Sequence, residues 1–311
     1  MKDLRIVFMG TPEFAVASLN ALVSAGCNIV GVITALDKPA GRGMQLQQSA
    51  VKKYALQKDL HILQPEKLKN PGFIDELKSL LADMQVVVAF RMLPEIVWNM
   101  PPLGTINVHA SLLPQYRGAA PINWAIINGE KETGITTFKL QQEIDTGNIL
   151  LQEKIAITEN ETAGELHDAL KELGASLIVK TINAIAEGSI EEKPQLIAQD
   201  SSLIIHHAPK LTTETCNINW NKSANDIFNL IRGLSPHPTA FTYLDDKAFK
   251  IFFGKKEIIA HRHADGSIHT DEKTFLKFAC ADGFIHCTDI QLQGKKRMPI
   301  EDFLRGYKFN K

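Results

Sequence analysis

The chain has 311 residues, of which 44% are apolar and 22% charged, and a formal net charge of -1. That composition is typical of a folded soluble protein and excludes a disordered chain. At about 150 residues per domain, the length predicts about two domains. No apolar run approaches the roughly 20 residues that span a bilayer, and residues 4–9 are too short for a secretion signal. We therefore expect a cytoplasmic protein with no membrane partner; we also expect it to be monomeric.

The cysteines give no support for a metal site or a disulfide framework. They lie far apart in the sequence, as Cys27, Cys216, Cys280 and Cys287, and none forms a C-x-x-C pair. A zinc ribbon or a thioredoxin-like motif is therefore unsupported. We expect reduced, mostly buried thiols, which suit the cytoplasm.

Short apolar runs alternate with helical patterns over the first 160 residues or so. We predict strands at residues 4–9, 28–34, 85–89 and 105–109, and helices at residues 12–25 and 49–57, the second capped by Ser49. Strands that are apolar on both faces and separated by helices pair in parallel, with right-handed crossovers. A later pair of strands is expected at residues 133–140 and 149–157. The pattern predicts a Rossmann-like α/β domain with a mostly parallel sheet.

The pattern changes after a long helix that begins near Thr162 and ends at Gly188. Residues 189–209 are polar with scattered apolar residues and contain two prolines, which makes this stretch a candidate linker. Beyond them, short strand-like runs at residues 240–243, 249–252, 274–279 and 284–287 indicate a small β-barrel of OB-like type. We therefore predict a catalytic domain over 1–188, a linker over 189–205 and a C-terminal β-domain over 206–311.

The charge is unevenly divided at this boundary. Residues 206–311 carry 16 Lys+Arg and 12 Asp+Glu, a net +4; residues 1–205 carry 18 and 23, a net -5, and the two sum to -1. A basic β-domain attached to an enzyme-like domain can bind a nucleic-acid backbone. An ordinary solvated surface explains the same charge equally well.

The first strand-to-helix turn argues against a nucleotide cofactor. It contains Gly10-Thr11-Pro12 rather than G-x-G-x-x-G, and the chain has no G-x-x-x-x-G-K-[ST] motif. The lack of the second motif excludes a P-loop NTPase. A dehydrogenase remains as a disfavoured alternative, and we expect neither NAD nor a metal.

Two polar residues lie on the predicted strand at residues 105–109. Asn107 and His109 share one face of it, because side chains alternate along a strand. In open α/β sheets, ligands bind at the carboxyl ends of the strands. An amide and an imidazole there can supply a hydrogen-bond donor and a proton acceptor. The alternative is a strand end with two hydrogen-bonded polar residues.

A turn between the two later strands carries a carboxylate. Its sequence is Asp145-Thr146-Gly147, and ordinary turn chemistry is sufficient to explain Asp145. Close to His109, the same carboxylate would orient the imidazole and stabilise its charged form.

Several segments taken together resemble one enzyme superfamily. Residues 107–109 (N-V-H), 111–114 (S-L-L-P), 116–121 (Y-R-G-A-A-P) and 145–147 (D-T-G) occur in the order seen in formyltransferases that use 10-formyltetrahydrofolate. Within that superfamily the sequence is most similar to the methionyl-tRNA formyltransferases. The loop at residues 37–43 and the segment at residues 231–240 support this narrower resemblance.

The resemblance implies a reaction and three catalytic residues. The α-amine of a methionyl ester on initiator tRNA would attack the formyl carbon of the co-substrate 10-formyltetrahydrofolate. Asn107 would donate a hydrogen bond to the resulting oxyanion, His109 would transfer a proton, and Asp145 would orient His109.

It also implies a folate pocket. Ser111, Leu112, Leu113 and Pro114 would form one folate-binding turn. Phe90, Arg91 and Met92 occupy the place of the other folate loop. They depart from the family pattern there, which usually has a glycine after the aromatic residue and one more residue before Leu-Pro.

Basic residues are the expected contacts to tRNA. They comprise Lys38, Arg42, Arg232, Lys295, Lys296 and Arg297. Two rival functions remain. A sugar-nucleotide N-formyltransferase shares the Asn-His-Asp set, but the loop at residues 38–43 and the basic β-domain disfavour it. A non-catalytic RNA-binding protein on the same scaffold is disfavoured by the intact catalytic set.

Overall fold

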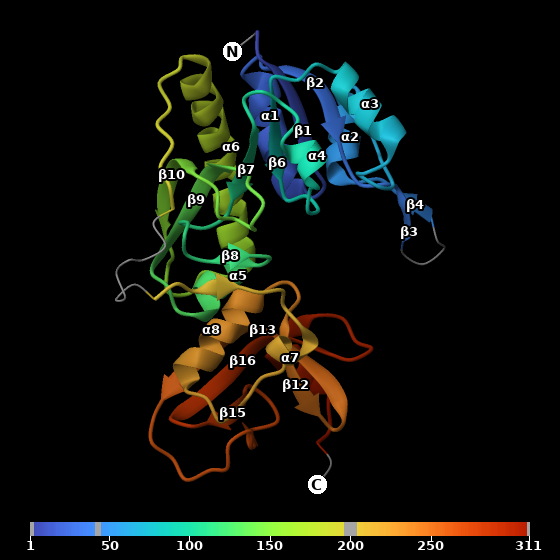
Figure 1. Cartoon of the computed structure of the whole chain (residues 1–311). Coiled ribbons are helices and arrows are strands. Elements are labelled where there is room, and N and C mark those ends of the chain that lie inside the picture. Colours follow the sequence, from blue (N-terminus) through green and yellow to red (C-terminus); the bar gives the residue numbers. More distant parts are fainter. Residues whose placement is uncertain (1–2, 41–44, 196–203, 310–311) are drawn as a thin grey trace. The chain divides into compact units, whose positions relative to one another are not determined.

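The computed structural model describes residues 3–40, 45–195 and 204–309 (Figure 1). The chain forms two compact units. The first comprises Met1–Arg117, Gly134–Ile155 and His167–His206, and the second comprises Gly118–Thr133, Ala156–Leu166 and His207–Lys311.

A seven-stranded sheet forms the centre of the first unit, in the order β10-β9-β7-β6-β1-β2-β5. Five strands are parallel: β1 (Arg5–Gly10), β2 (Asn28–Ile33), β5 (Ile62–Leu63), β6 (Met84–Val88) and β7 (Thr105–His109). Strand β9 (Glu132–Lys139) runs antiparallel to β7, and β10 (Ile149–Ala156) follows it at the edge. The predicted Rossmann-like, mostly parallel sheet is confirmed.

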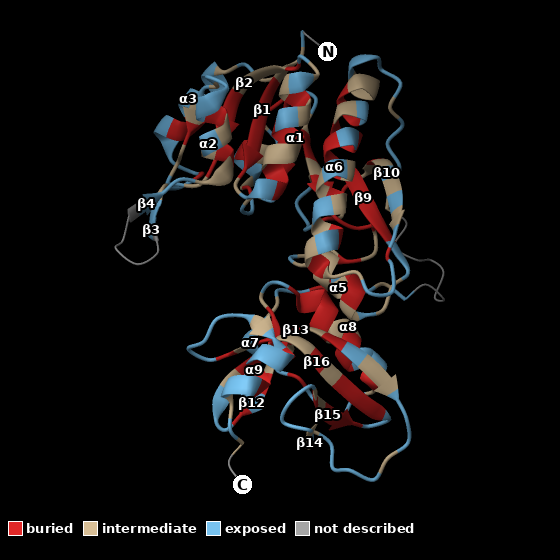
Figure 2. Ribbon diagram, turned by 180° about the vertical axis from the view of Figure 1, so that it is seen from behind, coloured by how far each residue is buried: buried red, intermediate tan, exposed pale blue. Residues whose placement is uncertain are grey.

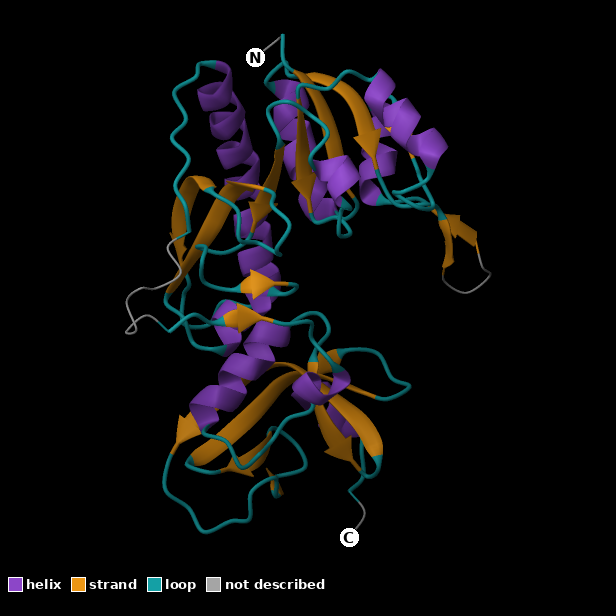
Figure 3. Cartoon of the chain, viewed as in Figure 1, coloured by secondary structure: helices purple, strands orange, loops and turns teal. Residues whose placement is uncertain are grey.

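Helices cover both faces of this sheet (Figure 3). They are α1 (Glu13–Ser24), α2 (Ala50–Gln57), α3 (Pro71–Ser79), α4 (Glu95–Trp98) and α6 (Ala163–Ala186). On one face, Met9 and Val87 pack with Phe73 of α3 and Val97 of α4. On the other face, Gly174 of α6 lies against Val108. A Cβ added to Gly174 would be 3.3 Å from Cγ1 of Val108.

Local sequence rules explain where several of these elements begin. Ser49 caps α2 as predicted, since its side chain accepts a hydrogen bond from the Lys52 amide. The polar stretch after β2 contains a hairpin that the sequence did not predict, made of β3 (Lys38–Ala40) and β4 (Gln45–Gln47). At its base, the Asp37 carboxylate binds Lys52 at 2.6 Å and accepts from Gln64 at 3.0 Å. These bonds hold the pKa of Asp37 below its ordinary value.

The second unit contains an antiparallel half-barrel sheet in the order β12-β13-β16-β15-β14, with β17 paired to β16. Its strands are β12 (Ala240–Leu244), β13 (Lys247–Ile258), β14 (Ile268–Thr270), β15 (Leu276–Cys280), β16 (Gly283–Leu292) and β17 (Met298–Pro299). The predicted small C-terminal β-domain is confirmed. Strands β13 and β16 are longer than predicted.

This unit also contains three helices, which are α7 (Thr213–Cys216), α8 (Ala224–Leu234) and α9 (Ile300–Gly306). Figure 2 shows buried residues along α8 and along the strands behind it. The same unit holds α5 (Pro121–Ile127) and the short strand β11 (His207–Ala208). Strand β11 pairs with β8 (Arg117–Gly118), of which Gly118 belongs to this unit. All four cysteines of the chain lie among the described residues and are buried, and none is joined in a disulfide, as predicted.

Candidate active site

Strand β7 presents Asn107 and His109 on one face, at its carboxyl end. It spans Thr105–His109, as predicted, and pairs in parallel with β6 and antiparallel with β9. The Asn107 side chain is partly exposed, and it makes no hydrogen bond with another of the described residues. Its amide group is therefore free to donate to a bound molecule.

The two ring nitrogens of His109 have different partners. Nε2 lies 2.9 Å from the carbonyl oxygen of Tyr116. Because a carbonyl oxygen only accepts, Nε2 carries the hydrogen and donates it. Nδ1 lies 3.8 Å from Oδ2 of Asp145. The imidazole is 7% exposed, so Nδ1, next to a carboxylate, is the nitrogen that can gain or lose a proton.

The turn that carries Asp145 is held by its own local geometry. Asp145 has φ +55°, a left-handed conformation that Asp tolerates better than most residues. An added Cβ on Gly147 would come within 1.6 Å of the Lys139 carbonyl oxygen, so only glycine fits there. The Thr146 hydroxyl donates to the Glu143 carbonyl at 3.1 Å. The shape of this turn therefore requires glycine at position 147 and is compatible with the Asp-Thr pair before it.

Two residues that the sequence interpretation did not select also support this turn. Arg117 donates to the side-chain oxygen of Gln195, and Gln195 donates to the backbone carbonyls of Asp145 and Gly147. Burial lowers the pKa of Arg117, and its attraction to Asp145 and Glu143 opposes that effect. Arg117 belongs to the Y-R-G-A-A-P motif, which was a detectable feature; Gln195 lies in a polar stretch with no motif.

The predicted folate-binding turn follows β7 directly. Its Ser111 hydroxyl donates to the Gln115 carbonyl at 2.6 Å. The Leu113 amide donates to Thr136 Oγ1 at 3.1 Å, and the Leu113 carbonyl accepts from Gln152 at 2.9 Å. These backbone groups, expected to face the folate, therefore have protein partners that fix the shape of the turn.

The other predicted folate loop is anchored through Arg91. Its guanidinium donates to the Pro65 carbonyl at 2.5 Å and to the Glu66 carbonyl at 2.9 Å. Phe90 packs against the apolar cluster on that face of the sheet, whereas Met92 is 75% exposed. The unusual Arg91 thus ties this loop to residues 65 and 66.

Several of the predicted tRNA contacts are exposed. Lys38 is exposed on β3, and Arg42 lies outside the described residues. Lys295 and Lys296 are exposed, in a turn with Gly294. Arg297 forms an ion pair with Asp289 and lies over the Phe252 ring, 4.2 Å from its centre.

Arg232 differs from these residues, and the expectation that it contacts tRNA was wrong. It is only 2% exposed. Its guanidinium donates to Asn229 Oδ1 at 2.9 Å and to the carbonyls of Glu161 and Thr158 at 3.1 Å and 3.4 Å. Burial also lowers its pKa. A phosphate cannot reach this side chain, so Arg232 is a structural residue that ties α8 to the segment before α6.

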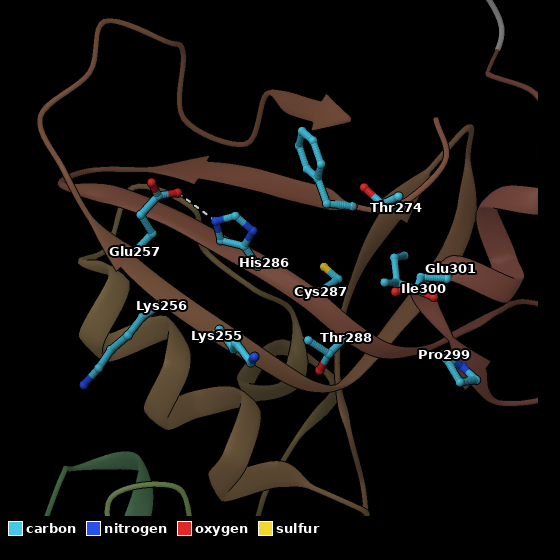
Figure 4. A pocket seen from close by; sticks show the side chains of 11 residues that line it. Lys255, Lys256, Glu257, Thr274, His286, Cys287, Thr288, Pro299, Ile300 and Glu301 are labelled. Atoms are coloured by element: carbon cyan, nitrogen blue, oxygen red, sulfur yellow. Dashed lines mark hydrogen bonds and ion pairs between the residues drawn. The ribbon is translucent and has the colours of Figure 1, made fainter. Parts of the chain in front are cut away.

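A cavity of about 470 Å³ lies on the C-terminal sheet (Figure 4). Lys255 and Lys256 of β13 and Thr288 of β16 line it. So does Glu257, which accepts a hydrogen bond from His286 at 2.7 Å and another from Lys277 at 2.8 Å. Because Glu257 and Glu301 offset the two lysines, the lining carries no net formal charge.

Comparison with known proteins identifies the family of the chain. A formyl transferase family model matches residues 4–182, and a model of the formyl transferase C-terminal domain matches residues 210–308. The chain therefore belongs to the formyl transferase family.

Curated relatives extend the similarity over the whole chain. A methionyl-tRNA formyltransferase of Parabacteroides distasonis is 53% identical over 99% of this chain and 97% of its own length. One from Phocaeicola vulgatus is 56% identical over the same shares. Within the family, the chain belongs with the methionyl-tRNA formyltransferases.

Solved structures share the fold at lower identity. A sugar 3N-formyl transferase, solved with dTDP and 5-N-formyl-THF, aligns with a TM-score of 0.67 at 23% identity, over 94% of this chain and 99% of its own. An N-formyltransferase from Helicobacter canadensis, solved with folinic acid and dTDP-3-aminofucose, aligns with a TM-score of 0.67 at 22% identity, over 93% of this chain and 100% of its own.

No helix within the described residues is long and apolar enough to cross a membrane.

Proposed function

We propose that this chain transfers the formyl group of 10-formyltetrahydrofolate to the α-amino group of methionyl initiator tRNA, in translation initiation. The observation that carries the proposal is the 3.8 Å approach of His109 Nδ1 to Asp145 Oδ2 at the end of the strand that also presents Asn107. The full-length similarity to methionyl-tRNA formyltransferases supports this choice of acceptor.

The amine of the methionyl ester is the nucleophile, so the reaction needs no serine or cysteine. A model α-amino group titrates at about 7.7–8.0, so a reactive fraction is neutral at physiological pH. Its attack on the formyl carbon gives a tetrahedral oxyanion. The unpaired Asn107 amide donates to that oxyanion, a contribution of about 3 kcal/mol to the transition state.

His109 removes the proton from the attacking nitrogen through Nδ1. Its Nε2–H is held by the Tyr116 carbonyl, which keeps the lone pair of the neutral ring on Nδ1. Once Nδ1 is protonated, the Asp145 carboxylate stabilises the imidazolium charge. The proton then passes to the departing folate nitrogen, and tetrahydrofolate is released.

Substrate binding is assigned to loops around this centre. The turns at residues 111–114 and 90–92 hold the folate, and Lys38, Arg42, Lys295, Lys296 and Arg297 contact tRNA. A catalytic domain over 1–188, a linker over 189–205 and a tRNA-binding domain over 206–311 divide these tasks. The protein works as a cytoplasmic monomer, without a metal or NAD.

A sugar-nucleotide N-formyltransferase is the second candidate, since two enzymes that act on amino sugars or bind a dTDP-sugar share this fold. One assay separates the candidates. The protein is incubated with 10-formyltetrahydrofolate and either methionyl initiator tRNA or dTDP-3-aminofucose, and the formylated product is measured. We expect formyl-methionyl-tRNA alone. Formylation of the sugar alone would select the second candidate, and no product with either would favour a non-catalytic RNA-binding protein.

A further inference from the structure

Residues 192–195, which we call the clamp segment, run beside the D-T-G turn. The backbone groups of Lys193 and Ile149 exchange two hydrogen bonds, at 2.7 Å and 2.8 Å. The Glu192 carboxylate binds Asn148 at 3.1 Å and also pairs with Lys139. The clamp segment is thus fixed at the point where the turn enters β10.

Gln195 uses all of its hydrogen-bonding capacity at this position. Its Nε2 donates to the carbonyl of Asp145 at 2.9 Å and to that of Gly147 at 2.8 Å. Its Oε1 accepts two bonds from the Arg117 guanidinium, the one from Nε at 3.1 Å. A side-chain amide has two donor hydrogens and one acceptor oxygen with two lone pairs. The amide of Gln195 is therefore fully satisfied and has one defined orientation.

The backbone it binds is one that needs support. Asp145 has φ +55°, and a non-glycine residue in the left-handed region costs about 1–3 kcal/mol unless its surroundings hold it there. Gln195 bonds the carbonyl of that same residue. In this backbone conformation the Asp145 carboxylate lies 3.8 Å from His109 Nδ1.

We propose that Gln195, oriented by Arg117, is a positioning residue for the formyl-transfer reaction: it holds the Asp145 backbone so that the carboxylate faces His109 Nδ1. Gln195 touches no substrate in this account and acts only through Asp145. The inference rests on the proposed role of Asp145.

A double-mutant cycle tests this role. The variants are Gln195→Leu, Asp145→Asn and the double variant, with kcat and KM for methionyl-tRNA measured for each. We expect Gln195→Leu to lower kcat by about 10–100-fold, because a displacement of about 1 Å can cost about 100-fold, with KM unchanged. In the Asp145→Asn background the same substitution should cost less than about threefold, because its target is already lost.

Gln195→Glu separates positioning from simple packing. A glutamate side chain still accepts hydrogen bonds from Arg117. In place of the NH₂ group of Gln195, however, it has an oxygen that faces the carbonyls of Asp145 and Gly147 and cannot donate to them. Positioning predicts that Gln195→Glu is as slow as Gln195→Leu while its thermal unfolding temperature stays close to that of the original protein. If only packing mattered, Gln195→Glu would keep the original kcat.

Gln57→Leu is the matched control, since Gln57 is an exposed residue at the end of α2; its kcat should be unchanged. Equal losses from Gln195→Leu in both backgrounds would overturn the inference alone and leave the role of Asp145 intact. A normal kcat for Asp145→Asn would overturn the proposed role of Asp145 and the inference with it.

Discussion

The two ring nitrogens of His109 have different partners, and the proposed reaction depends on this difference. Nε2 is held by a carbonyl of the Y-R-G-A-A-P motif, and Nδ1 faces Asp145. A fixed tautomer places the basic lone pair on one known atom. In the proposed reaction, that atom takes up the proton of the attacking amine, 3.8 Å from the Asp145 carboxylate.

Gly147 provides a test of the turn at the scale of one residue. Gly147→Ala would place a Cβ 1.6 Å from the Lys139 carbonyl oxygen, so the turn must move and carry Asp145 with it. We expect kcat to fall by about 100-fold, since a shift of about 1 Å is enough for such a loss. Steady-state formylation kinetics measure this effect.

Gly306→Ala is the control for that substitution, because a Cβ there meets no atom within 4 Å. It should leave kcat unchanged. A Gly147→Ala enzyme with full activity would show that the position of the turn does not matter.

The residues of this site differ in how far the sequence could predict them. Asn107 and His109 stand two positions apart on a strand, and that spacing alone predicts a shared face. Gln195 could not be found in this way. It is a single glutamine in a polar stretch, 50 residues from the turn that it supports, and only the folded chain brings the two together.

Elements with a local cause were the ones predicted correctly. The cap Ser49 gave the start of α2, and the apolar run before His109 gave β7. Helix α8 was missed, although its sequence contains a cap at Ser223 and buried residues at helical spacing, among them Ile227 and Ile231. The hairpin of β3 and β4 is too short and polar to be recognised by pattern.

His269 on strand β14 gives a prediction about pH. Burial lowers the pKa of His269, and the nearby His263, Lys277 and His261 lower it further. When the pH is below 6.5, the ordinary pKa of His269, this residue binds a proton more readily in the unfolded chain than in the folded chain. The contribution of this group to stability is therefore full above that pH and declines as the pH falls below it.

We accordingly expect the thermal unfolding temperature to decrease from pH 7 to pH 5, and less so for His269→Gln than for the original protein. Differential scanning calorimetry across this range measures the difference. His61→Gln, on an exposed residue, is the control and should follow the original curve. Parallel curves for His269→Gln and the original protein would show that His269 does not contribute.

On the scale of the whole molecule, the small net charge of -1 conceals two regions of opposite sign, -5 over residues 1–205 and +4 over residues 206–311. The sequence shows this division of charge, but it does not show which basic side chains are exposed on the surface. Arg232 and Lys295 look alike in a sequence, yet one is 2% exposed and the other lies on the surface. Burial depends on the tertiary fold, so charge counts alone could not separate a structural cation from a surface one.

Arg232→Met is predicted to destabilise the protein without changing how tRNA binding depends on salt. It leaves the acceptors at Asn229, Glu161 and Thr158 without their donor. Each unsatisfied buried acceptor costs about 1–3 kcal/mol, so the free energy of unfolding should fall by about 3 kcal/mol. Denaturant unfolding measures this loss.

The double variant Lys295→Ala, Lys296→Ala should change the salt dependence of tRNA binding without changing stability. Each phosphate contact that is lost lowers the salt dependence of binding by about 0.7–0.9 in the log–log slope. We expect weaker tRNA binding with a smaller slope, and unchanged stability because both side chains are exposed. Titration of initiator tRNA at several salt concentrations provides the slope, and an unaltered slope would remove these lysines from the interface.

The most direct test of the whole account compares chemistry with binding in Asn107→Ala. The kcat for formylation of methionyl initiator tRNA and the Kd for that tRNA are measured on the same preparation. Loss of the oxyanion donor should lower kcat by about 100- to 1,000-fold and leave Kd unchanged. Equal losses in kcat and affinity, or a normal kcat, would contradict the assignment of Asn107 to the oxyanion.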